Sequence, residues 1–413
     1  MEPKIRLKGF SEEWKSDAIG NIATFSKGRG YSKSDLSPEG NPIILYGRLY
    51  TNYTSIIDSV DTYAPLKNDS VLSKGNEVII PGSGETAEDI AVASSVQQKG
   101  VILGGDLNIV TFDSDKIVPA FAAMSITNSK THYELSGYAQ GKTIVHIHND
   151  SISKGHLSYP SKNEQVAIVS YISSLDSLIQ STAKKIESLK QVKAASLQSM
   201  FPQEGETTPR VRFKGFDGEW EKVLVGKLGK SYSGLSGKSK DDFGIGDARY
   251  VTFLNVLTNA IIDTSILETV NVCEGEHQNE VKKGDLLFNT SSETPEEVGM
   301  CAVMDEELAN VFLNSFCFGF RVTDNNIDST FIAYLMRSHI GRGLMAILAQ
   351  GATRYNLSKN SFCKAELLLP KAKKEQSAIA EFFISLDSQI TLQTQRLEKL
   401  KQIKSACLDN MFV

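Results

Sequence analysis

Two glycine-rich stretches have spacings that could bind phosphate groups. Gly82–Ala87 reads GSGETA after an apolar run, with Asp106 about 20 residues further on, as in a dinucleotide-binding turn. A corresponding later stretch, Asn289–Thr294, contains no glycine, so we favour an ordinary turn. Gly234–Ser239 imitates a phosphate-binding loop, but such a loop requires a glycine where Tyr232 stands. Neither stretch predicts a nucleotide site.

Two histidines have a spacing that would suit metal ligation. His146 and His148 are one residue apart, which places both side chains on one edge of a strand. No cysteine or acidic cluster stands beside them, and we place Tyr355 and Leu357 at the corresponding positions later in the chain. We therefore expect structural histidines or nucleic-acid contacts, and no metal.

No catalytic motif is visible in the sequence. It has no G-x-S-x-G nucleophile elbow, no methyltransferase-like NPP[FY] loop and no convincing carboxylate–carboxylate–lysine cluster. The odd number of cysteines and the absence of a CxxC pair predict reduced core thiols in a cytosolic protein. These cysteines are Cys273, Cys301, Cys317, Cys363 and Cys407. The sequence thus indicates a protein that is not an enzyme and binds no cofactor.

The composition is that of a soluble protein with two or three domains. The chain has 413 residues, of which 41% are hydrophobic and 23% charged. Its charged start predicts no signal peptide, and no apolar run is long enough for a membrane helix. The net charge of −5 argues mildly against nucleic-acid binding, although it does not describe local patches or what partners supply.

The chain is an internal duplication. PKIRLKGFSEEW at Pro3–Trp14 reappears as PRVRFKGFDGEW at Pro209–Trp220, with the two tryptophans of the chain at equivalent positions. Residues 163–201 align without gaps to residues 374–412. Shorter matches pair Ala139-Gln140-Gly141 with Ala349-Gln350-Gly351 and Pro160 with Pro370. Matches in three blocks in the same order establish a repeat.

The aligned stretches predict two long amphipathic helices. Apolar residues recur at steps of three and four, and no proline or glycine interrupts either stretch of about 39 residues, or roughly 58 Å. The seam comprises Ile168, Ile172, Leu175, Ile179, Ile186, Leu189 and Val192 in one helix and Ile379, Phe383, Leu386, Ile390, Leu397, Leu400 and Ile403 in the other. Because a single apolar stripe must be buried, we expect the helices to pair, with Thr182 and Gln393 fixing the register. The alternative is two unrelated surface helices.

The remaining segments predict strand-rich mixed domains. VILGGDLNIVTF, NEVIIPGS, RYVTFLNV and LNSFCFGFRVT are short β-rich runs, and residues 331–348 and the segment from Pro119 predict short helices. The fold class is α+β, with domains at 1–158 and 206–370 and long helices at 159–205 and 371–413. The two domains match at their edges and differ in their middles, which indicates equal frames with different interiors.

This arrangement resembles the specificity subunit of Type I restriction–modification systems over the whole chain. The resemblance is carried by the domain-opening pattern K-x-R-x-K-G-F-x-x-x-W, which begins with arginine in the second copy, and by the helix pattern E-Q-x-A-I, L-D, K-Q-x-K and M-F, each present twice. It implies two target recognition domains, an antiparallel coiled coil and a bipartite double-stranded DNA site. It also implies a cytoplasmic complex with two methyltransferase subunits and with restriction or motor subunits, and these partners would bind S-adenosylmethionine and ATP. Asp176 and Asp387, with the neighbouring seam residues, are then expected to be partner or coiled-coil contacts.

Physical arguments lead to the same expectation. Two similar domains on a rigid rod match the pseudo-symmetry of duplex DNA, so each would read one half-site. One extra helical turn adds about 5.4 Å, or one to two base pairs, so the helices would set the spacer length. Partner subunits could supply most of the phosphate contacts, and we therefore expect the isolated chain to bind DNA weakly.

Basic, amide and aromatic side chains on loops are the candidate DNA contacts. Arginine and lysine pair with guanine, glutamine pairs with adenine, and glycines let the backbone approach phosphates. The candidates are Lys27, Arg29, Arg48, Tyr50, Tyr53, Gln140, Lys142 and Thr143 in the first copy and Lys238, Arg249, Gln350, Thr353, Arg354 and Tyr355 in the second. The alternative for each is an ordinary solvated loop.

Two other functions remain open from the sequence. One is an enzyme whose catalytic motif is not recognisable, and the other is a scaffold of two modules that bind a partner other than DNA. Co-expression with a methyltransferase subunit would separate them, because only the specificity subunit forms a complex that methylates a split sequence.

Overall fold

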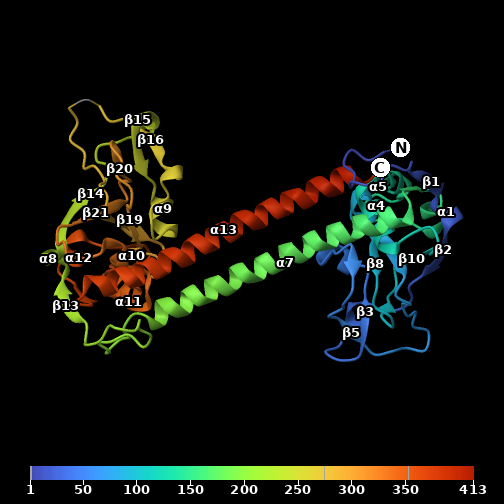
Figure 1. The fold of residues 1–413 in the computed structure, drawn as a ribbon, viewed down its shortest axis with the longest axis horizontal. Coiled ribbons are helices and arrows are strands. Elements are labelled where there is room, and N and C mark those ends of the chain that lie inside the picture. Colours follow the sequence, from blue (N-terminus) through green and yellow to red (C-terminus); the bar gives the residue numbers. More distant parts are fainter. Residues whose placement is uncertain (1, 274, 352) are drawn as a thin grey trace. The chain divides into compact units, whose positions relative to one another are not determined.

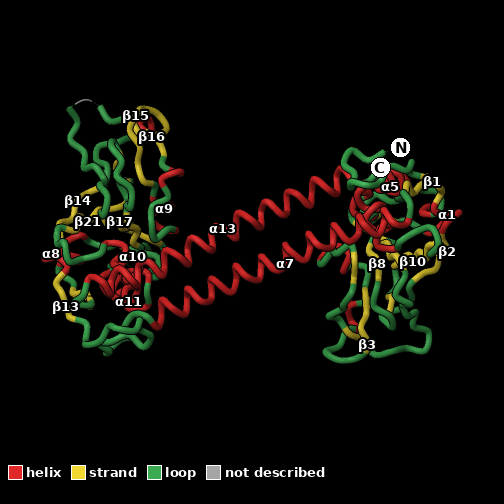
Figure 2. Tube along the Cα trace, viewed as in Figure 1, coloured by secondary structure: helices red, strands yellow, loops and turns green. Residues whose placement is uncertain are grey.

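The computed structural model describes residues 2–273, 275–351 and 353–413, which form two compact units (Figure 1). Unit 1 comprises Met1–Ala183 and Gln395–Val413, and unit 2 comprises Lys184–Thr394. Each unit therefore contains one globular domain, part of the first long helix and part of the second. Figure 2 shows that each domain mixes strands with short helices, and this confirms the predicted α+β class.

The domain of unit 1 is built on a five-stranded sheet of order β2-β10-β6-β8-β4. Its elements are β1 Lys15–Ala18, α1 Ile19–Ile22, β2 Ala23–Lys27, η1 Lys33–Asp35, β3 Asn41–Ile44, α2 Arg48–Thr51, β4 Ile56–Ile57, β5 Tyr63–Ala64, β6 Glu77–Pro81, β7 Ser83–Gly84, α3 Ala87–Ile90, β8 Ser94–Val96, β9 Ile102–Leu103, β10 Leu107–Phe112, α4 Pro119–Asn128, α5 Lys130–Tyr138, β11 Val145–His146, α6 Asn149–Ile152 and β12 His156–Tyr159. The long helix α7 Lys162–Ser199 follows.

The domain of unit 2 is built on a sheet of order β14-β21-β17-β19. Its elements are β13 Glu221–Leu224, α8 Val225–Leu228, β14 Gly229–Ser233, η2 Lys240–Asp242, β15 Phe243–Val251, α9 Phe253–Thr258, η3 Thr264–Ile266, β16 Glu268–Val270, β17 Asp285–Asn289, β18 Ser291–Ser292, β19 Cys301–Val303, β20 Val311–Leu313, β21 Cys317–Val322, α10 Ser329–Arg337, α11 His339–Leu348, β22 Tyr355–Asn356, α12 Lys359–Cys363 and β23 Glu366–Leu369. The long helix α13 Lys373–Met411 follows.

The two domains repeat one topology. The antiparallel pair β1–β12 corresponds to β13–β23, and β7–β11 corresponds to β18–β22. The parallel pair β3–β9 likewise corresponds to β15–β20. The order β2-β10-β6-β8 reappears as β14-β21-β17-β19. The duplication predicted from the edges of the sequence thus extends through the weakly similar middles.

One predicted strand is only half correct. In the run RYVTFLNV, β15 ends at Val251 and α9 begins at Phe253. The hydroxyl of Thr252 accepts a hydrogen bond of 3.2 Å from the amide of Asn255, which is the N-cap of a helix. The apolar alternation hid this cap, because a threonine is as common in strands as it is at helix starts.

The long helices bury the predicted seam only in part. Ile168, Ile172 and Leu175 are buried in the core of unit 1, and Ile379, Phe383 and Leu386 in that of unit 2. Ile186 is also buried, whereas Ile179, Leu189, Ile390, Leu397 and Leu400 are half-buried. Val192 and Ile403, which occupy equivalent positions, are 48% and 37% exposed. The prediction that these two belong to the seam is wrong.

Within each unit the two long helices run antiparallel. In unit 1, Lys404 near the end of α13 donates to Asp176 near the start of α7, over 2.5 Å. In unit 2, Lys193 near the end of α7 donates to Asp387 near the start of α13, where Asp387 also accepts from the hydroxyl of Tyr334. Both predicted aspartates are therefore helix–helix contacts. Thr182 is buried and Gln393 is half-buried.

The end of each long helix enters the core of the other globular domain. Phe412, after α13, is buried in unit 1 with its ring 5.6 Å from that of Phe121. Phe201, after α7, is buried in unit 2 with its ring 5.8 Å from that of Phe331. Burying a phenylalanine contributes roughly 1.5–3 kcal/mol, so the helix ends belong to the domains they enter. The sequence pattern M-F at both ends follows from this packing.

A clamp on the long helices explains the domain-opening pattern. Arg6 donates two hydrogen bonds of 2.8 Å to Glu164 at the start of α7, whose side chain is 1% exposed. Arg212 makes the same pair with Glu375 at the start of α13, at 2.7 and 2.8 Å. Paired arginine and carboxylate planes are strong and geometrically specific. The repeated arginine and glutamate therefore attach each domain to its long helix in the same way.

The glutamine after each of these glutamates fixes a second helix. The side-chain oxygen of Gln165 accepts from the amide of Val118, the residue before α4, at 2.8 Å. That of Gln376 accepts from the amide of Asp328, the residue before α10, at 2.9 Å. These amides would otherwise lack a partner in the helix. The repeated E-Q pair thus orients the domain on its long helix.

The cysteines are only partly the core thiols that the sequence predicts. Cys301, Cys317 and Cys407 are buried, but Cys363 is half-buried and Cys273 is exposed. Among the residues that the structure describes, no helix is long and apolar enough to cross a membrane.

Candidate nucleic-acid interface

A short hydrogen-bonded loop presents the first repeated motif. In unit 1 the amide and carbonyl of Gln140 exchange hydrogen bonds with those of His146, at 3.0 and 2.8 Å. Gly141 has φ +136°, and a Cβ there would lie 2.0 Å from the carbonyl oxygen of Ile144. Only glycine fits this position. Lys142, Thr143 and Ile144 are exposed on the loop.

Unit 2 contains the same loop with other side chains. The amide and carbonyl of Gln350 exchange hydrogen bonds of 3.0 and 2.8 Å with those of Asn356. Gly351 has φ +141°, and a Cβ there would lie 2.0 Å from the carbonyl oxygen of Arg354. Thr353 and Arg354 are exposed on this loop. The two loops therefore share their closing hydrogen bonds and the conformation of their glycine.

These hydrogen bonds correct the predicted correspondence of the histidines. His146 is equivalent to Asn356, because each closes the loop in its own domain. His148 precedes α6 as Ser358 precedes α12, so Ser358 is its counterpart. Tyr355 and Leu357 are therefore not the counterparts, and the sequence alignment was one residue out of register. The side chains of His146 and Ser83 lie 2.8 Å apart.

The counterpart of the glycine-rich turn in unit 2 also lies one residue later than predicted. The carbonyl of Gly82 accepts from Ile147, and that of Thr290 accepts from Leu357, at 3.0 and 2.8 Å. Thr290 is therefore the counterpart of Gly82, in place of Asn289. In both domains this turn joins the end of the central sheet to the loop that carries the glutamine motif. It is a structural turn, as the sequence predicts.

The predicted basic loop passes close to a neighbouring turn. A Cβ on Gly28 would lie 1.9 Å from the carbonyl oxygen of Gly104, and the amide of Gly105 donates to Gly30 at 2.6 Å. In unit 2, a Cβ on Gly234 would likewise lie 2.1 Å from the carbonyl oxygen of Asn314. The glycine is thus required in both copies for this close approach. Lys27 and Arg29 are exposed in the first copy.

A groove of about 1620 Å³ in unit 1 gathers several of the predicted contacts. Residues of α2 and its flanks line it together with the basic loop, the β7 turn and the glutamine-motif loop. The predicted contacts among its lining residues are Arg48, Tyr50, Tyr53 and Thr143, and Tyr31 of the basic loop also lines it. Segments far apart in sequence therefore meet on one concave surface.

Tyrosine rings form part of the apolar lining of this groove. Tyr46, Tyr50 and Tyr53 are 38–40% exposed, and the rings of Tyr46 and Tyr50 meet edge to face at 6.5 Å. The hydroxyl of Tyr50 donates to the carbonyl of Ser83 at 2.7 Å, and burial raises its pKa. The hydroxyl of Tyr53 donates to the carbonyl of Ala93 at 3.2 Å. These hydrogen bonds fix the rings of Tyr50 and Tyr53 and occupy their hydroxyl groups. A ligand would therefore meet the ring surfaces.

Tyr46 was not among the residues predicted from the sequence. A signal existed, since Tyr46 and Tyr50 are four residues apart around a short helix, and such residues lie on one face.

The charged side chains of the groove include more acids than bases. Arg48 donates to Asp61 at 2.9 Å and its side chain is 15% exposed, so its charge is already paired. Lys33 also lines the groove, and so do the carboxylates of Glu85, Asp89 and Asp106. Such a surface does not attract phosphates, whereas carboxylates can accept hydrogen bonds from the amino groups of bases. The groove suits base edges better than the backbone of DNA.

The predicted contacts of unit 2 have different surroundings. Gln350, Thr353 and Arg354 are exposed, whereas Tyr355 is half-buried in β22. Arg249 is half-buried in β15. Lys238 is 5% exposed and donates to Glu276 at 2.5 Å. The charge of Lys238 is therefore paired with a carboxylate of its own domain, and its contact with DNA stays a prediction.

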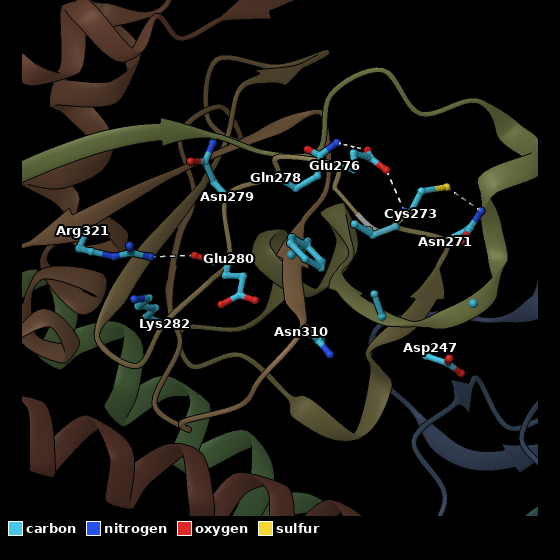
Figure 3. A pocket seen from close by; sticks show the side chains of 14 residues that line it. Asp247, Asn271, Cys273, Glu276, Gln278, Asn279, Glu280, Lys282, Asn310 and Arg321 are labelled. Carbon is cyan, nitrogen blue, oxygen red and sulfur yellow. Dashed lines mark hydrogen bonds between the residues drawn. The ribbon is translucent and has the colours of Figure 1, made fainter.

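A second pocket, of about 620 Å³, has Glu276 of this ion pair in its lining (Figure 3). Glu276 accepts hydrogen bonds from Lys238, Gln278 and the amide of Cys273, and these bonds lower its pKa to about 2. Arg321 points across the pocket and donates to the carbonyl of Glu280 at 2.8 Å. Of the described residues that line it, none is a predicted DNA contact. Glu276 and Gln278, at least, are paired with other groups of the domain.

Comparisons with known proteins agree with this architecture. The family model of the Type I restriction modification DNA specificity domain matches residues 11–191 and again residues 218–402. The chain is 21% identical over 417 residues to the Type I restriction enzyme MjaVIII specificity subunit of Methanocaldococcus jannaschii, covering 96% of this chain and 92% of that protein.

Two solved structures share the fold. One is the Type I restriction–modification S subunit from M. genitalium, with a TM-score of 0.57 and 16% identity, covering 100% of this chain and 99% of that one. The other is the HsdS subunit from Thermoanaerobacter tengcongensis, with a TM-score of 0.51 and 14% identity, covering 97% and 96%.

The chain therefore belongs to the family of Type I restriction modification DNA specificity domains and carries two copies of the domain. It is a specificity subunit of a Type I restriction–modification system, a DNA-recognition subunit and not a catalytic one. The resemblance inferred from the doubled sequence patterns is confirmed.

Proposed function

We propose that each domain reads one half of a bipartite target in double-stranded DNA. One observation carries this proposal, namely that both domains hold the same loop shape and expose different side chains on it. The loop of unit 1 exposes Thr143 and Ile144, and that of unit 2 exposes Thr353 and Arg354. Equal frames with unequal side chains suit two half-sites of different sequence.

Two methyltransferase subunits dock on the repeated frames in this proposal. Apolar side chains at equivalent positions of the two long helices are not fully buried: Tyr171 is 39% exposed, Val192 48% and Ile403 37%, and Phe382 is half-buried. Repeated apolar positions that are not buried support a repeated protein contact. Restriction or motor subunits would join the same cytoplasmic complex. S-adenosylmethionine and ATP would be bound by these partners and not by this chain.

The long helices set the spacer between the half-sites in this proposal. Inserting seven residues after Thr182 and seven after Gln393 keeps the apolar seam in phase and adds about 10 Å, or roughly three base pairs. The complex should then methylate the same half-sites with a longer spacer. An unchanged spacer in a complex that still methylates would contradict this part of the proposal.

Co-expression with the methyltransferase subunit of the same system tests the central claim. Methylation-sensitive sequencing of the host DNA should reveal one split motif, and the isolated chain should bind that motif only weakly at physiological salt. Failure to associate with the methyltransferase, or methylation of an undivided motif, would overturn the proposal. Tight specific binding by the isolated chain would contradict only the dependence on partners.

A further inference from the structure

Two loop tips lie side by side at one rim of each domain. In unit 1, Gly82 donates to the carbonyl of Asp106 at 2.7 Å and accepts from the amide of Ile147 at 3.0 Å. In unit 2, Thr290 donates to the carbonyl of Phe316 at 3.0 Å and accepts from the amide of Leu357 at 2.8 Å. One residue therefore ties the β9–β10 turn to the glutamine-motif loop in unit 1, and the β20–β21 turn to that loop in unit 2.

These bonds establish which side chains are equivalent. Asp106 corresponds to Phe316, because the carbonyl of Asp106 accepts from the amide of Gly82 and that of Phe316 accepts from the amide of its counterpart, Thr290. Ile144 corresponds to Arg354, because each carbonyl oxygen lies 2.0 Å from the Cβ that the loop glycine lacks. All four side chains are exposed, with Phe316 at 61% and Ile144 at 56%. Asp106 and Ile144 both line the groove of unit 1.

At these two positions the charged and the apolar side chain change places between the domains. Unit 1 has an acid at the turn and an apolar side chain on the loop, whereas unit 2 has an aromatic ring at the turn and a cation on the loop. Two other positions of the rim keep their residue type, since Thr143 and Thr353 are both threonines and Glu85 and Glu293 are both glutamates at matching distances from β7 and β18. The exchanged pair is therefore a place where the two rims differ in chemistry.

We infer that Asp106 and Ile144 in the first domain, and Phe316 and Arg354 in the second, are specificity-determining residues that contact bases. This inference rests on the proposed function and names the residues that carry it out. Asp106 would accept a hydrogen bond from the amino group of cytosine or adenine, and Arg354 would donate two to guanine. Ile144 and Phe316 would lie against a thymine methyl group or another apolar base edge.

The two polar members are available for such contacts. Among the residues that the structure describes, the side chains of Asp106 and Arg354 form no ion pair and no hydrogen bond. Arg48 and Lys238, by contrast, are already paired with acids of their own domains. A charged side chain that is exposed and unpaired loses less on binding DNA than one that must first leave a partner. This distinction favours the two rim positions over the other predicted contacts.

The test exchanges the loop residues in the complete methyltransferase complex. Ile144→Arg should create a preference for guanine at one position of the first half-site, and Arg354→Ile should remove one from the second, each by about tenfold or more. Asp106→Asn introduces a residue that, like aspartate, tolerates the φ of +62° at this position. It should weaken the base preference at one position of the first half-site. Ile266→Arg, at the exposed isoleucine that ends η3, is the control and should change neither half-site.

Methylation-sensitive sequencing reads both half-sites in one experiment, so the unmutated domain reports that each variant chain is folded. Where a variant abolishes all methylation, competition binding with DNA duplexes that vary each base supplies the same readout. Retention of both half-sites by all three variants, or a change in the half-site of the unmutated domain, would overturn the inference. A wild-type complex that methylates no split motif would instead overturn the proposed function.

Discussion

Arg6 and Glu164 face each other through two parallel hydrogen bonds of 2.8 Å, and Arg212 and Glu375 repeat the pair in the second unit. The arginine opens the domain and the glutamate opens the long helix that follows it. Each pair therefore ties the first segment of a domain to the helix that leaves it. Each glutamate is buried, so its carboxylate depends on the arginine for compensation.

Replacing Arg6 should destabilise unit 1 strongly. Arg6→Met leaves the carboxylate of Glu164 buried without its partner, which costs about 3 kcal/mol. Calorimetry should show a lower unfolding temperature for one transition. The control is Arg210→Met, because Arg210 pairs with Glu206 at the surface, where solvent screens the pair and it contributes little to stability. Equal effects of the two substitutions would refute the structural importance of the clamp.

Removing the aromatic ring at the end of α13 should weaken the domain at the start of the chain. Phe412→Ala deletes a buried ring beside Phe121 and should cost about 3–5 kcal/mol. Hydrogen exchange measured by mass spectrometry should become faster in α4 and stay unchanged in α10. Faster exchange in α10 alone would show that the helix end belongs to the other unit.

A methyl group on the loop glycine should disable one half-site. Gly351→Ala places a Cβ against the carbonyl of Arg354 at a φ of +141°, a strain of about 1–3 kcal/mol. Methylation that depends on the second half-site should fall by about tenfold while the unfolding temperature changes little. Gly343→Ala is the matched control, because Gly343 lies within α11 with no atom near its missing Cβ. A similar loss in both variants would argue against a role for the loop.

Lys27 should contribute affinity without sequence preference. It lies on the basic loop and is exposed, with the imidazole of His148 at 3.4 Å. Lys27→Ala should weaken DNA binding by the complex equally for specific and unrelated duplexes, and should reduce the salt dependence by about one ion. Binding measured at several salt concentrations provides the check. Altered base preference with an unchanged salt slope would assign Lys27 to base contact.

The ion pair of unit 2 predicts resistance to acid. Hydrogen bonds from Lys238 and Gln278 lower the pKa of Glu276 from 4.5 to about 2. A carboxyl with a lowered pKa stabilises the fold above its unfolded pKa, and this contribution is lost as the pH falls through the folded pKa. An NMR titration should find Glu276 ionised at pH 3, and Lys238→Met should raise its pKa toward 4.5. An unchanged titration in the variant would refute the pairing.

The sequence predicts the repeat, the long helices and the fold class because these depend on periodic spacing. Ile168, Ile172 and Leu175 recur at helical steps, and burial of such a stripe needs no knowledge of the partner. The role of Arg6 was recognisable only as part of a motif, since its partner lies 158 residues away. The repeated glutamate is visible in the alignment, but a linear pattern does not show which arginine pairs with which glutamate.

The candidate site is less accessible to sequence reasoning. Arg48 and Lys238 look like DNA contacts by residue type, yet each is occupied by an acid that only the fold brings near. From the sequence, Asp106 stands out only by its spacing from Gly82–Ala87, as in a dinucleotide-binding turn. Its counterpart is Phe316, so similarity between the copies gave no reason to connect them. The hydrogen bonds of the backbone supply that connection where the side chains share no chemistry.

The entry of Phe412 into the first domain has a consequence for the order in which the protein matures on the ribosome. Domains usually fold in the order of their synthesis. Unit 2 is one continuous stretch, Lys184–Thr394, whereas unit 1 needs Gln395–Val413 to complete its core. Unit 2 can therefore close first, while the apolar surface around Phe121 stays uncovered until Gln395–Val413 has been translated. The nascent first domain would be the part of the chain that most needs a chaperone.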